Sequence, residues 1–312
     1  MNKKCKISIV IPVYNAAESL EELQAEIALC AQKNNYLIET VYVEDCSKDS
    51  SWDVLKKLKK DYAESVRIIK LAMNSGQHKA ILCGLNNISK DSDYVLTMDD
   101  DLQHPPAEIP RLIEKLQEGF DFVCGQYDTK KHKISRNICS DMVNWLIRKN
   151  YKLPNNFHFT SFQGVKADVV PAVVSMTGVF PYIACMFLAN SGSYANVNIH
   201  HEERKHGVSN YNFRKSVALF FNLFFNYTSY PLWIVGAVCL FTLLVTSTLM
   251  VYVFSLWAWR GTAPGWASTM LLTSFLHSMV LGCLFIFSIY ISRINTQIST
   301  SKSKYRIAEF HE

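Results

Sequence analysis

Residues 95–106 read VLTMDDDLQHPP, a short apolar run that ends in three consecutive aspartates. Like charges side by side are costly unless a cation lies among them. Alternate residues of an extended segment face the same way, so we expect Asp99, Asp101 and Gln103 to share one face and Asp100 to turn elsewhere. Hard divalent cations such as Mg²⁺ or Mn²⁺ take such oxygen ligands, often together with substrate phosphates. The stretch indicates either a metal site that carries a diphosphate or a solvated acidic turn.

Outward from this stretch, apolar runs and helical stretches alternate along the N-terminal part of the chain. Strands are predicted at 7–13, 40–44, 66–72, 94–98 and 120–127. Helices are predicted between them at 16–33, 49–62, 76–88 and 105–119. Runs this apolar indicate strands covered on both faces, and the alternating order predicts an α/β fold with a mostly parallel sheet.

Polar residues follow each of the first four predicted strands. In parallel sheets, ligands bind outside the carboxyl ends of the strands. The residues that the sequence places there are Pro12, Tyr14, Asn15, Asp45, Gly76, Asp99, Asp100 and Asp101. A G-x-G-x-x-G motif does not follow the first strand, and no G-x-x-x-x-G-K-[ST] motif occurs, which argues against a dinucleotide fold and excludes a P-loop. A site of another kind is expected at this edge of the sheet.

The C-terminal third of the chain differs sharply in composition. Residues 216–259 contain no Asp, Glu, Lys, Arg or His, and residues 261–292 contain only His277. A helix that spans a bilayer needs roughly 20 apolar residues. We therefore predict a hairpin of two transmembrane helices, at about 231–256 and 266–292. Two buried core helices are the alternative.

Basic residues predict the orientation of this hairpin. They flank both spans, whereas the link between the spans holds only Arg260; the flanking residues are Arg204, Lys205, Arg214, Lys215, Arg293, Lys302, Lys304 and Arg306. The positive-inside rule then places the large domain and both termini in the cytoplasm, in a protein of the inner or plasma membrane. The N-terminus runs directly into a predicted strand, so no cleavable signal peptide is expected. The net charge of +5 suits an anionic leaflet and is too small to indicate nucleic acid.

These features divide the chain into four parts. Residues 1–213 are expected to form the cytoplasmic α/β domain and residues 293–312 a cytoplasmic tail. Between them, residues 214–230 precede the hairpin at 231–292. The phenylalanines and flanking basic residues of 214–230 are typical of an interfacial amphipathic helix that lies among lipid headgroups. The alternative is that this segment extends the first transmembrane helix.

Several motifs, in order along the chain, resemble those of a known family. They are IVIPVYNA, VYVEDCSKDSS, NSGQHKAILCGL and MDDDLQHPP, followed by FTSFQGVKADVV and HHEERKHGVSNY. This series resembles the family-2 glycosyltransferases of GT-A fold. It is most similar to the polyprenyl-phosphate glycosyltransferases, such as dolichol-phosphate mannose synthase and bacterial undecaprenyl-phosphate sugar transferases. With the hydrophobic hairpin included, the resemblance covers nearly the whole chain.

The resemblance implies a metal-dependent, inverting transfer of one sugar from a nucleotide sugar, which we expect to be UDP-linked, to a polyprenyl phosphate such as undecaprenyl phosphate. The donor would be bound by Pro12, Tyr14, Asn15, Asp45, Gly76, Asp99 and Asp100. Mg²⁺ or Mn²⁺ would be held by Asp99, Asp101 and Gln103. Asp101, through the metal, and Arg204 would be the catalytic residues. The acceptor phosphate would be bound by Arg136, Ser140, Arg204 and Lys205.

The residues themselves bear on two of these roles. Arg136, Ser140 and Asn144 fall on one face of a helix, which indicates either a phosphate cradle or an ordinary solvated face. A sugar hydroxyl acceptor needs a general base, whereas a phosphate monoester, with a second pKa of about 6, is already largely ionised at neutral pH. Residues 177–186, TGVFPYIACM, hold no carboxylate, and Q-x-x-R-W is absent from the chain. Lipid phosphate is therefore the favoured acceptor. A hydroxyl acceptor on a lipid-linked saccharide and a catalytically silent scaffold are the alternatives.

Some positions depart from the family pattern. Ala16 stands where relatives carry glutamate, Cys46 where glycine is usual and Gln126 where many carry arginine. Ser161–Phe162–Gln163 replaces a D-F-R-type motif. These departures leave the sugar and the nucleotide open. Assembly of a homo-oligomer through the hairpin is likewise open.

Overall fold

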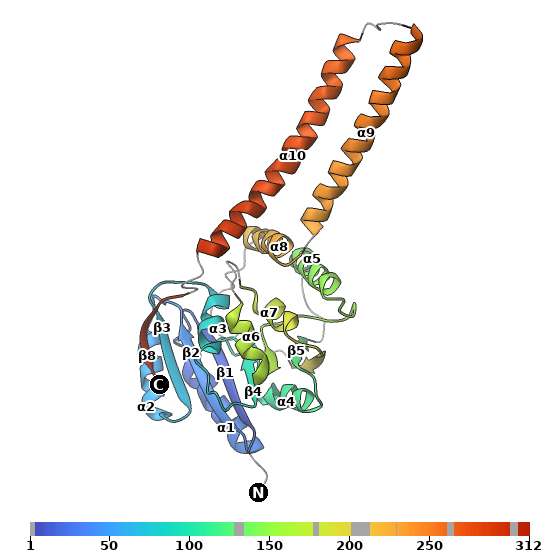
Figure 1. Ribbon diagram of the computed structural model, residues 1–312. Coiled ribbons are helices and arrows are strands. Elements are labelled where there is room, and N and C mark those ends of the chain that lie inside the picture. The colour runs from blue at the N-terminus through green and yellow to red at the C-terminus, as the bar shows by residue number, and fades with distance from the viewer. Residues whose placement is uncertain are drawn as a thin grey trace. The chain divides into compact units, whose positions relative to one another are not determined.

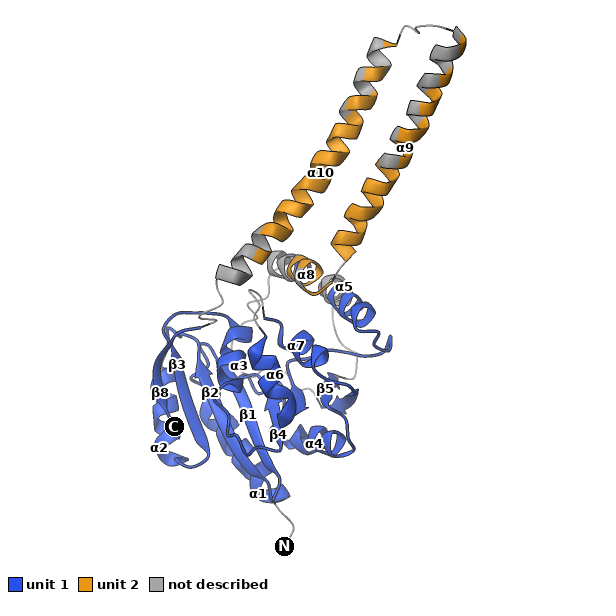
Figure 2. Ribbon diagram, viewed as in Figure 1, with its two compact units in different colours: residues 1–220, 301–312 blue, residues 221–300 orange. Residues whose placement is uncertain are grey.

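The computed structural model describes residues 4–127, 134–176, 181–200, 213–228, 230–260, 265–299 and 305–312. The chain divides into two compact units (Figure 2). Residues 1–220 and 301–312 form the first unit, and residues 221–300 form the second. The strands all lie in the first unit as far as the chain is described, and the two longest helices lie in the second.

Eight strands form one mostly parallel sheet in the described part of the first unit (Figure 1). Their order across the sheet is β7-β5-β6-β4-β1-β2-β3-β8. The bounds are β1 Lys6–Val13, β2 Leu37–Glu44, β3 Val66–Leu71, β4 Tyr94–Thr97, β5 Phe122–Tyr127, β6 Gln163–Lys166, β7 Tyr194–Ile199 and β8 Ile307–His311. β1 runs parallel to β2 and β4, and β2 runs parallel to β3. The predicted α/β fold with a mostly parallel sheet is confirmed.

Helices cover both faces of this sheet, which is why its central strands are almost wholly apolar. Ile7, Ile9 and Ile11 of β1 pack in one core with α1, α2 and α4. Val10 faces the opposite side, where α3 lies against it and packs with α6 and α7. The helix bounds are α1 Leu20–Asn34, α2 Ser51–Asp61, α3 Gln77–Leu85, α4 Ile109–Gln117, α5 Ile134–Asn150, α6 Val170–Ser175 and α7 Ile183–Ala189, with short 3₁₀ turns η1 at Pro106–Glu108 and η2 at Ala167–Val169.

The C-terminal residues form part of the sheet. We expected residues 293–312 to be a tail, but α10 continues to Ser299 and β8 pairs antiparallel with β3 at the edge of the sheet (Figure 1). Without β8, the outer N–H and C=O groups of β3 would form an unpaired strand edge. A five-residue strand too short to stand out in the sequence satisfies that edge.

The second unit consists of long helices. It contains α9 (Tyr230–Arg260), α10 (Trp266–Ser299) and the end of α8 (Phe213–Tyr227). Large apolar side chains are exposed on both long helices, including Trp233 at 75% and Phe285 at 68%. Among the described residues, no helix is both long enough and apolar enough to cross a membrane. The structure therefore contains two long helices where the hairpin was predicted, and their insertion into a membrane stays a prediction.

Candidate active site

The loops that follow β1, β2 and β4 meet at one edge of the sheet, as expected for parallel strands. The backbone N–H of Asn15 donates to Ser47 Oγ over 3.0 Å. The backbone N–H of Tyr14 donates to the Asp100 carboxylate over 3.1 Å. These two hydrogen bonds tie the loop after β1 to its neighbours on both sides.

Asp45, on the loop after β2, connects the loop after β3 to the loops that follow β1, β2 and β4. Its two carboxylate oxygens accept hydrogen bonds from the backbone N–H groups of Ser75 and Gly76, over 2.6 and 2.8 Å. Gly76 has φ of 89°, a conformation that favours glycine. Burial raises the pKa of Asp45, and the two N–H groups partly oppose that rise. Asp45 therefore organises the edge of the site, and direct contact with a nucleotide stays a prediction.

The other two aspartates of interest, Asp99 and Asp101, lie on the loop after β4. One oxygen of Asp99 accepts a hydrogen bond from Gln77 Nε2 over 2.7 Å, and the other accepts one from Ser161 Oγ. Asp101 accepts a hydrogen bond from the backbone N–H of Gln103 over 3.2 Å. The start of α3, the segment before β6 and the acidic loop itself thus each supply a group that orients the two carboxylates.

Asp100, between them, is turned away from its neighbours' side, as the sequence predicted. Its carboxylate contacts the Tyr14 N–H, and its backbone carbonyl accepts a hydrogen bond from Ser19 Oγ over 2.5 Å. Burial, assisted by the charges of Asp99 and Asp101, raises the pKa of Asp100 to about 7. Asp100 is therefore only partly ionised at neutral pH, which limits the repulsion among the three aspartates.

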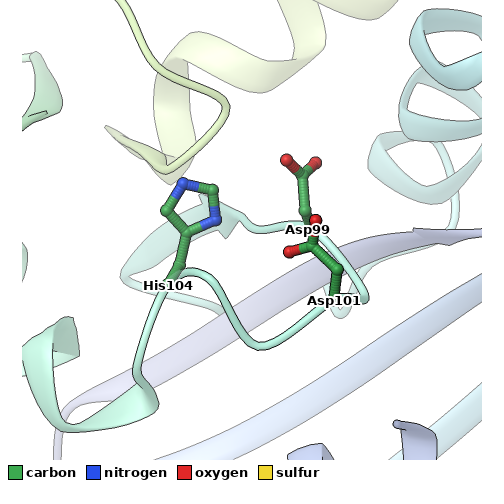
Figure 3. Close-up of side chains that lie close together, drawn as sticks. All are labelled: Asp99, Asp101 and His104. Atoms are coloured by element: carbon green, nitrogen blue, oxygen red, sulfur yellow. The ribbon is translucent and has the colours of Figure 1, made fainter. Parts of the chain in front are cut away.

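Asp99, Asp101 and His104 form a group that could hold a metal ion. One ligand atom from each lies within 4.8 Å of the others. Figure 3 shows the three side chains gathered on one loop, with the Asp101 carboxylate turned toward the His104 imidazole. The His104 ring is buried and stacks on Phe162, with ring centroids 5.4 Å apart. A metal role for Gln103, predicted from the sequence, stays a prediction.

The backbone of this loop explains why sequence reasoning did not select His104. We assumed an extended segment, in which Asp99, Asp101 and Gln103 share a face. Leu102 has φ of 60°, in the left-handed region, so the alternation ends there. The residue brought back beside the carboxylates is His104. A histidine five residues after Asp99 was the available signal, since imidazole is a common metal ligand.

The remaining donor-side candidates lie at the same edge. Pro12 is buried within β1, whereas the Tyr14 side chain is 38% exposed. Asn15 adopts φ of 53°, and its side-chain oxygen accepts a hydrogen bond from the Lys48 N–H over 2.9 Å. The edge therefore presents an aromatic face next to carboxylates.

The acceptor-side candidates lie outside what the structure describes. Arg136 and Ser140 belong to α5, but their side chains are not among those described. Arg204 and Lys205 fall within residues 201–212, which are also outside the described residues. Their roles stay predictions.

Comparison with known proteins supplies the family. The model of glycosyl transferase family 2 matches residues 8–165, which include most of β1, the whole of β2 to β5 and the acidic loop. The chain belongs to glycosyltransferase family 2. This confirms the resemblance noted in the sequence, and it makes the protein an enzyme of the glycosyltransferase class.

Relatives within this family share most of the chain. The undecaprenyl-phosphate 4-deoxy-4-formamido-L-arabinose transferase of Salmonella choleraesuis (strain SC-B67) is 30% identical over 230 residues, which is 73% of this chain and 69% of that protein. The corresponding transferase of Salmonella newport (strain SL254) matches with the same identity and coverage.

Solved glycosyltransferase structures share the fold. Glucosyl-3-phosphoglycerate synthase from Mycobacterium tuberculosis, in complex with Mn²⁺ and UDP-glucose, aligns with a TM-score of 0.53 at 15% identity, covering 72% of this chain and 78% of that one. Mannosyl-3-phosphoglycerate synthase from Rubrobacter xylanophilus aligns with a TM-score of 0.51 at 14% identity, covering 70% and 71%. At such identities the likeness establishes the fold alone, and it confirms the predicted GT-A-like α/β fold.

Cys46 shows what one departure from the family pattern involves. In this glycosyltransferase Cys46 has φ of 59°, which lies in the left-handed region of backbone conformation. A glycine would be unstrained there. Cys46 is exposed and follows Asp45 directly, so its side chain projects from the edge of the site without disturbing the Asp45 hydrogen bonds.

Ser161 is a site residue that the sequence pointed to only as a departure. β6 pairs antiparallel with β4, and Gln163 lies opposite Thr97, so the residues just before β6 lie beside the end of β4. The Thr97 hydroxyl donates to the Ser161 carbonyl over 2.9 Å, which fixes this segment. Ser161 Oγ then reaches Asp99.

Ser161→Ala is expected to weaken Mn²⁺ binding about tenfold, since groups that orient metal ligands typically contribute that much. Titration of the purified enzyme with Mn²⁺, followed by calorimetry, measures the effect. Ser161→Thr keeps the hydroxyl and is expected to bind Mn²⁺ like the natural enzyme. Equal affinities for the alanine variant and the natural enzyme would show that Asp99 needs no such partner.

His78, in the first turn of α3, is a partly buried titratable group near this edge. Its Nδ1 is shielded from solvent and has no hydrogen-bond partner among the described residues. Its ring lies 4.8 Å from that of Tyr182, centroid to centroid. Burial lowers the pKa of His78 to about 4.

This pKa predicts that acid destabilises the fold. In the unfolded chain His78 takes up a proton near its ordinary pKa of 6.5, whereas in the folded chain it does so only near 4. Its contribution to stability is therefore complete above pH 6.5 and is lost as pH falls toward 4. Between pH 7.5 and pH 5 the loss is about 2 kcal/mol. Urea unfolding at both pH values measures it, and His78→Gln should reduce the difference by that amount; an unchanged difference would contradict this account.

Proposed function

We propose that this glycosyltransferase moves one sugar, with inversion, from a nucleotide sugar to a polyprenyl phosphate at the cytoplasmic face of a membrane. The observation that carries the proposal is the similarity, over most of both chains, to transferases named for undecaprenyl phosphate. The lack of a carboxylate in residues 177–186 supports a phosphate acceptor, since an ionised phosphate needs no general base.

The residues after β4 fit a divalent cation. Two carboxylates suit Mg²⁺ and Mn²⁺ alike, and the imidazole of His104 favours Mn²⁺, since a transition metal accepts nitrogen ligands more readily. Asp99, Asp101 and His104 would hold the metal, with Gln103 as a further candidate ligand. Such a metal supplies a Lewis acid for the departing diphosphate. Asp101 and Arg204 are the residues that we propose for catalysis.

The chain's own groups would bind the donor at the same edge. The exposed ring of Tyr14 offers an aromatic face for a nucleotide base. Pro12, Asn15 and Gly76 are further donor-binding residues that we propose. We propose a UDP-linked donor. For the acceptor phosphate we propose four groups, as the sequence indicates: Arg136, Ser140, Arg204 and Lys205.

We propose that α9 and α10 lie in the membrane as a hairpin, with α8 at the headgroup region. The many apolar side chains exposed on both helices support this, as does the scarcity of charged residues from 216 to 292. Alkaline extraction of membranes from expressing cells is the direct test. The chain should stay in the pellet, and its release into the supernatant would contradict the hairpin.

The reaction is tested by transfer of label from radiolabelled nucleotide sugars to undecaprenyl phosphate in detergent. A lipid-extractable product with one donor, lost when EDTA removes the metal, is the expected result and also identifies the sugar. The enzyme could instead bind the nucleotide, form no product on undecaprenyl phosphate and transfer the sugar to a lipid-linked saccharide. That result would replace the proposed phosphate acceptor by a hydroxyl acceptor. Neither binding nor product would indicate a silent scaffold.

A further inference from the structure

The C-terminal segment, residues 305–312, docks beside the loop that carries the partners of Asp45. In the β3–β8 ladder, Lys70 lies opposite Glu309 and Leu71 opposite Ile307. The pairing continues beyond β3, since the backbone N–H of Ala72 donates to the Arg306 carbonyl over 2.8 Å. Ala72 is the first residue of the β3–α3 loop, residues 72–76.

The same segment also contacts the helix to which this loop leads. The side chain of Tyr305 lies close to the side chains of Cys83 of α3 and of Asn86 at the C-terminal end of that helix. The ring contact of His311 with Trp52, at 5.9 Å between centroids, anchors the far end of the segment on α2. The C-terminal segment therefore fixes the start of the β3–α3 loop and the helix at its end.

The residues between Ala72 and the body of α3 belong to the candidate active site. Ser75 and Gly76 donate their backbone N–H groups to Asp45, and Gln77 donates to Asp99. A shift of the loop would move all three donors together. The positions of Asp45 and Asp99 thus depend on a loop whose start is paired with the C-terminal segment.

The docking itself rests on weak interactions. All five side chains of β8 are exposed. Its ion pairs are at the surface: Glu309 lies 3.9 Å from Lys70 and Glu312 lies 3.0 Å from Arg67, with the glutamates 48% and 72% exposed. Such pairs contribute little, so a segment of this kind detaches at a lower cost than global unfolding. We therefore expect the rest of the sheet to persist when the segment is released.

We propose that the C-terminal segment is a positioning element: by pairing with Ala72 and holding α3 through Tyr305, it keeps the β3–α3 loop in the conformation that presents Gln77 to the metal-binding carboxylates. This goes beyond the proposed sugar transfer and rests on the proposed function only for the metal ion that the carboxylates would hold. Because coupling between two sites is reciprocal, metal binding strengthens docking of the segment by the same factor.

The test compares the full chain with a chain that ends at Lys304. Hydrogen–deuterium exchange of peptides covering residues 72–77 and calorimetric titration with Mn²⁺ are the two measurements. Truncation should speed exchange over 72–77 and weaken Mn²⁺ binding about tenfold, as loss of a group that orients a metal ligand does. Tyr305→Phe, which keeps the ring and the strand, should weaken Mn²⁺ binding less than truncation does. Glu309→Gln is the matched control on the exposed side and should match the natural chain.

Natural exchange over 72–77 and natural Mn²⁺ affinity in the truncated chain would overturn the proposal. If the truncated chain does not fold, the natural chain decides: addition of Mn²⁺ must slow exchange over residues 305–312, and unchanged exchange overturns the proposal. Neither measurement uses a nucleotide sugar or a lipid. A chain that transfers no sugar in the assay above therefore still gives a clear result here.

Discussion

Asp101→Asn is expected to lower the rate constant of sugar transfer about 10³-fold, the scale of a lost electrostatic contact in the transition state. Asparagine has nearly the shape of aspartate and can still accept the hydrogen bond that the Gln103 N–H donates. The loop should therefore keep its conformation while the ligand charge is lost. Initial rates of lipid-extractable product, together with Mn²⁺ titration, measure both consequences.

Asp100→Asn is the matched control for this experiment. It removes a carboxylate from the adjacent residue, but that carboxylate is turned to the Tyr14 N–H, and with its pKa raised to about 7 it is only partly ionised at neutral pH. Mn²⁺ affinity should stay close to that of the natural enzyme. If both variants lose Mn²⁺ equally, the three aspartates act as a diffuse negative charge, and the acidic loop is a solvated turn.

The difference between these two aspartates is a part of the site that the sequence could predict. Alternation along an extended strand assigns Asp99 and Asp101 to one side and Asp100 to the other, and β4 carries that alternation into the first residues of its loop. The predicted alternation ends at Leu102, which has a positive φ. Leucine rarely adopts a positive φ, so the sequence does not indicate this turn of the backbone.

Contacts between segments distant in the sequence could not be predicted from the sequence, for a related reason. The predicted strands and helices around the parallel core lie close to the observed ones, since long apolar runs decide them locally. β6 has only four residues and β8 five, and each exists because a neighbour offers an edge for pairing. The pairing of β6 and of β8 places Ser161 and Tyr305 beside their partners. The local sequence pattern does not indicate these strand pairings.

Gly84→Leu is expected to lower the free energy of unfolding by at least about 3 kcal/mol, through overpacking between α3 and the sheet. A Cβ built on Gly84 would lie 2.3 Å from Val10 Cγ1 and 3.2 Å from Val43 Cγ2. Both valines are fully buried, and a β-branched side chain has little freedom to rotate away. The helix must therefore move off the sheet. Urea unfolding in detergent, followed by tryptophan fluorescence, measures the loss.

Two further comparisons separate overpacking from a general intolerance of substitution. Gly192→Ala places its Cβ 3.4 Å from the Asp121 side chain, an ordinary contact, and should change stability little. Gly84→Ala should cost less in a Val10→Ala background than alone, because the valine methyl that it meets is then absent. Equal costs in both backgrounds would show that the contact with Val10 is not the cause. Because α3 begins with Gln77, a displaced helix should also weaken Mn²⁺ binding, and this would link a core glycine to the candidate active site.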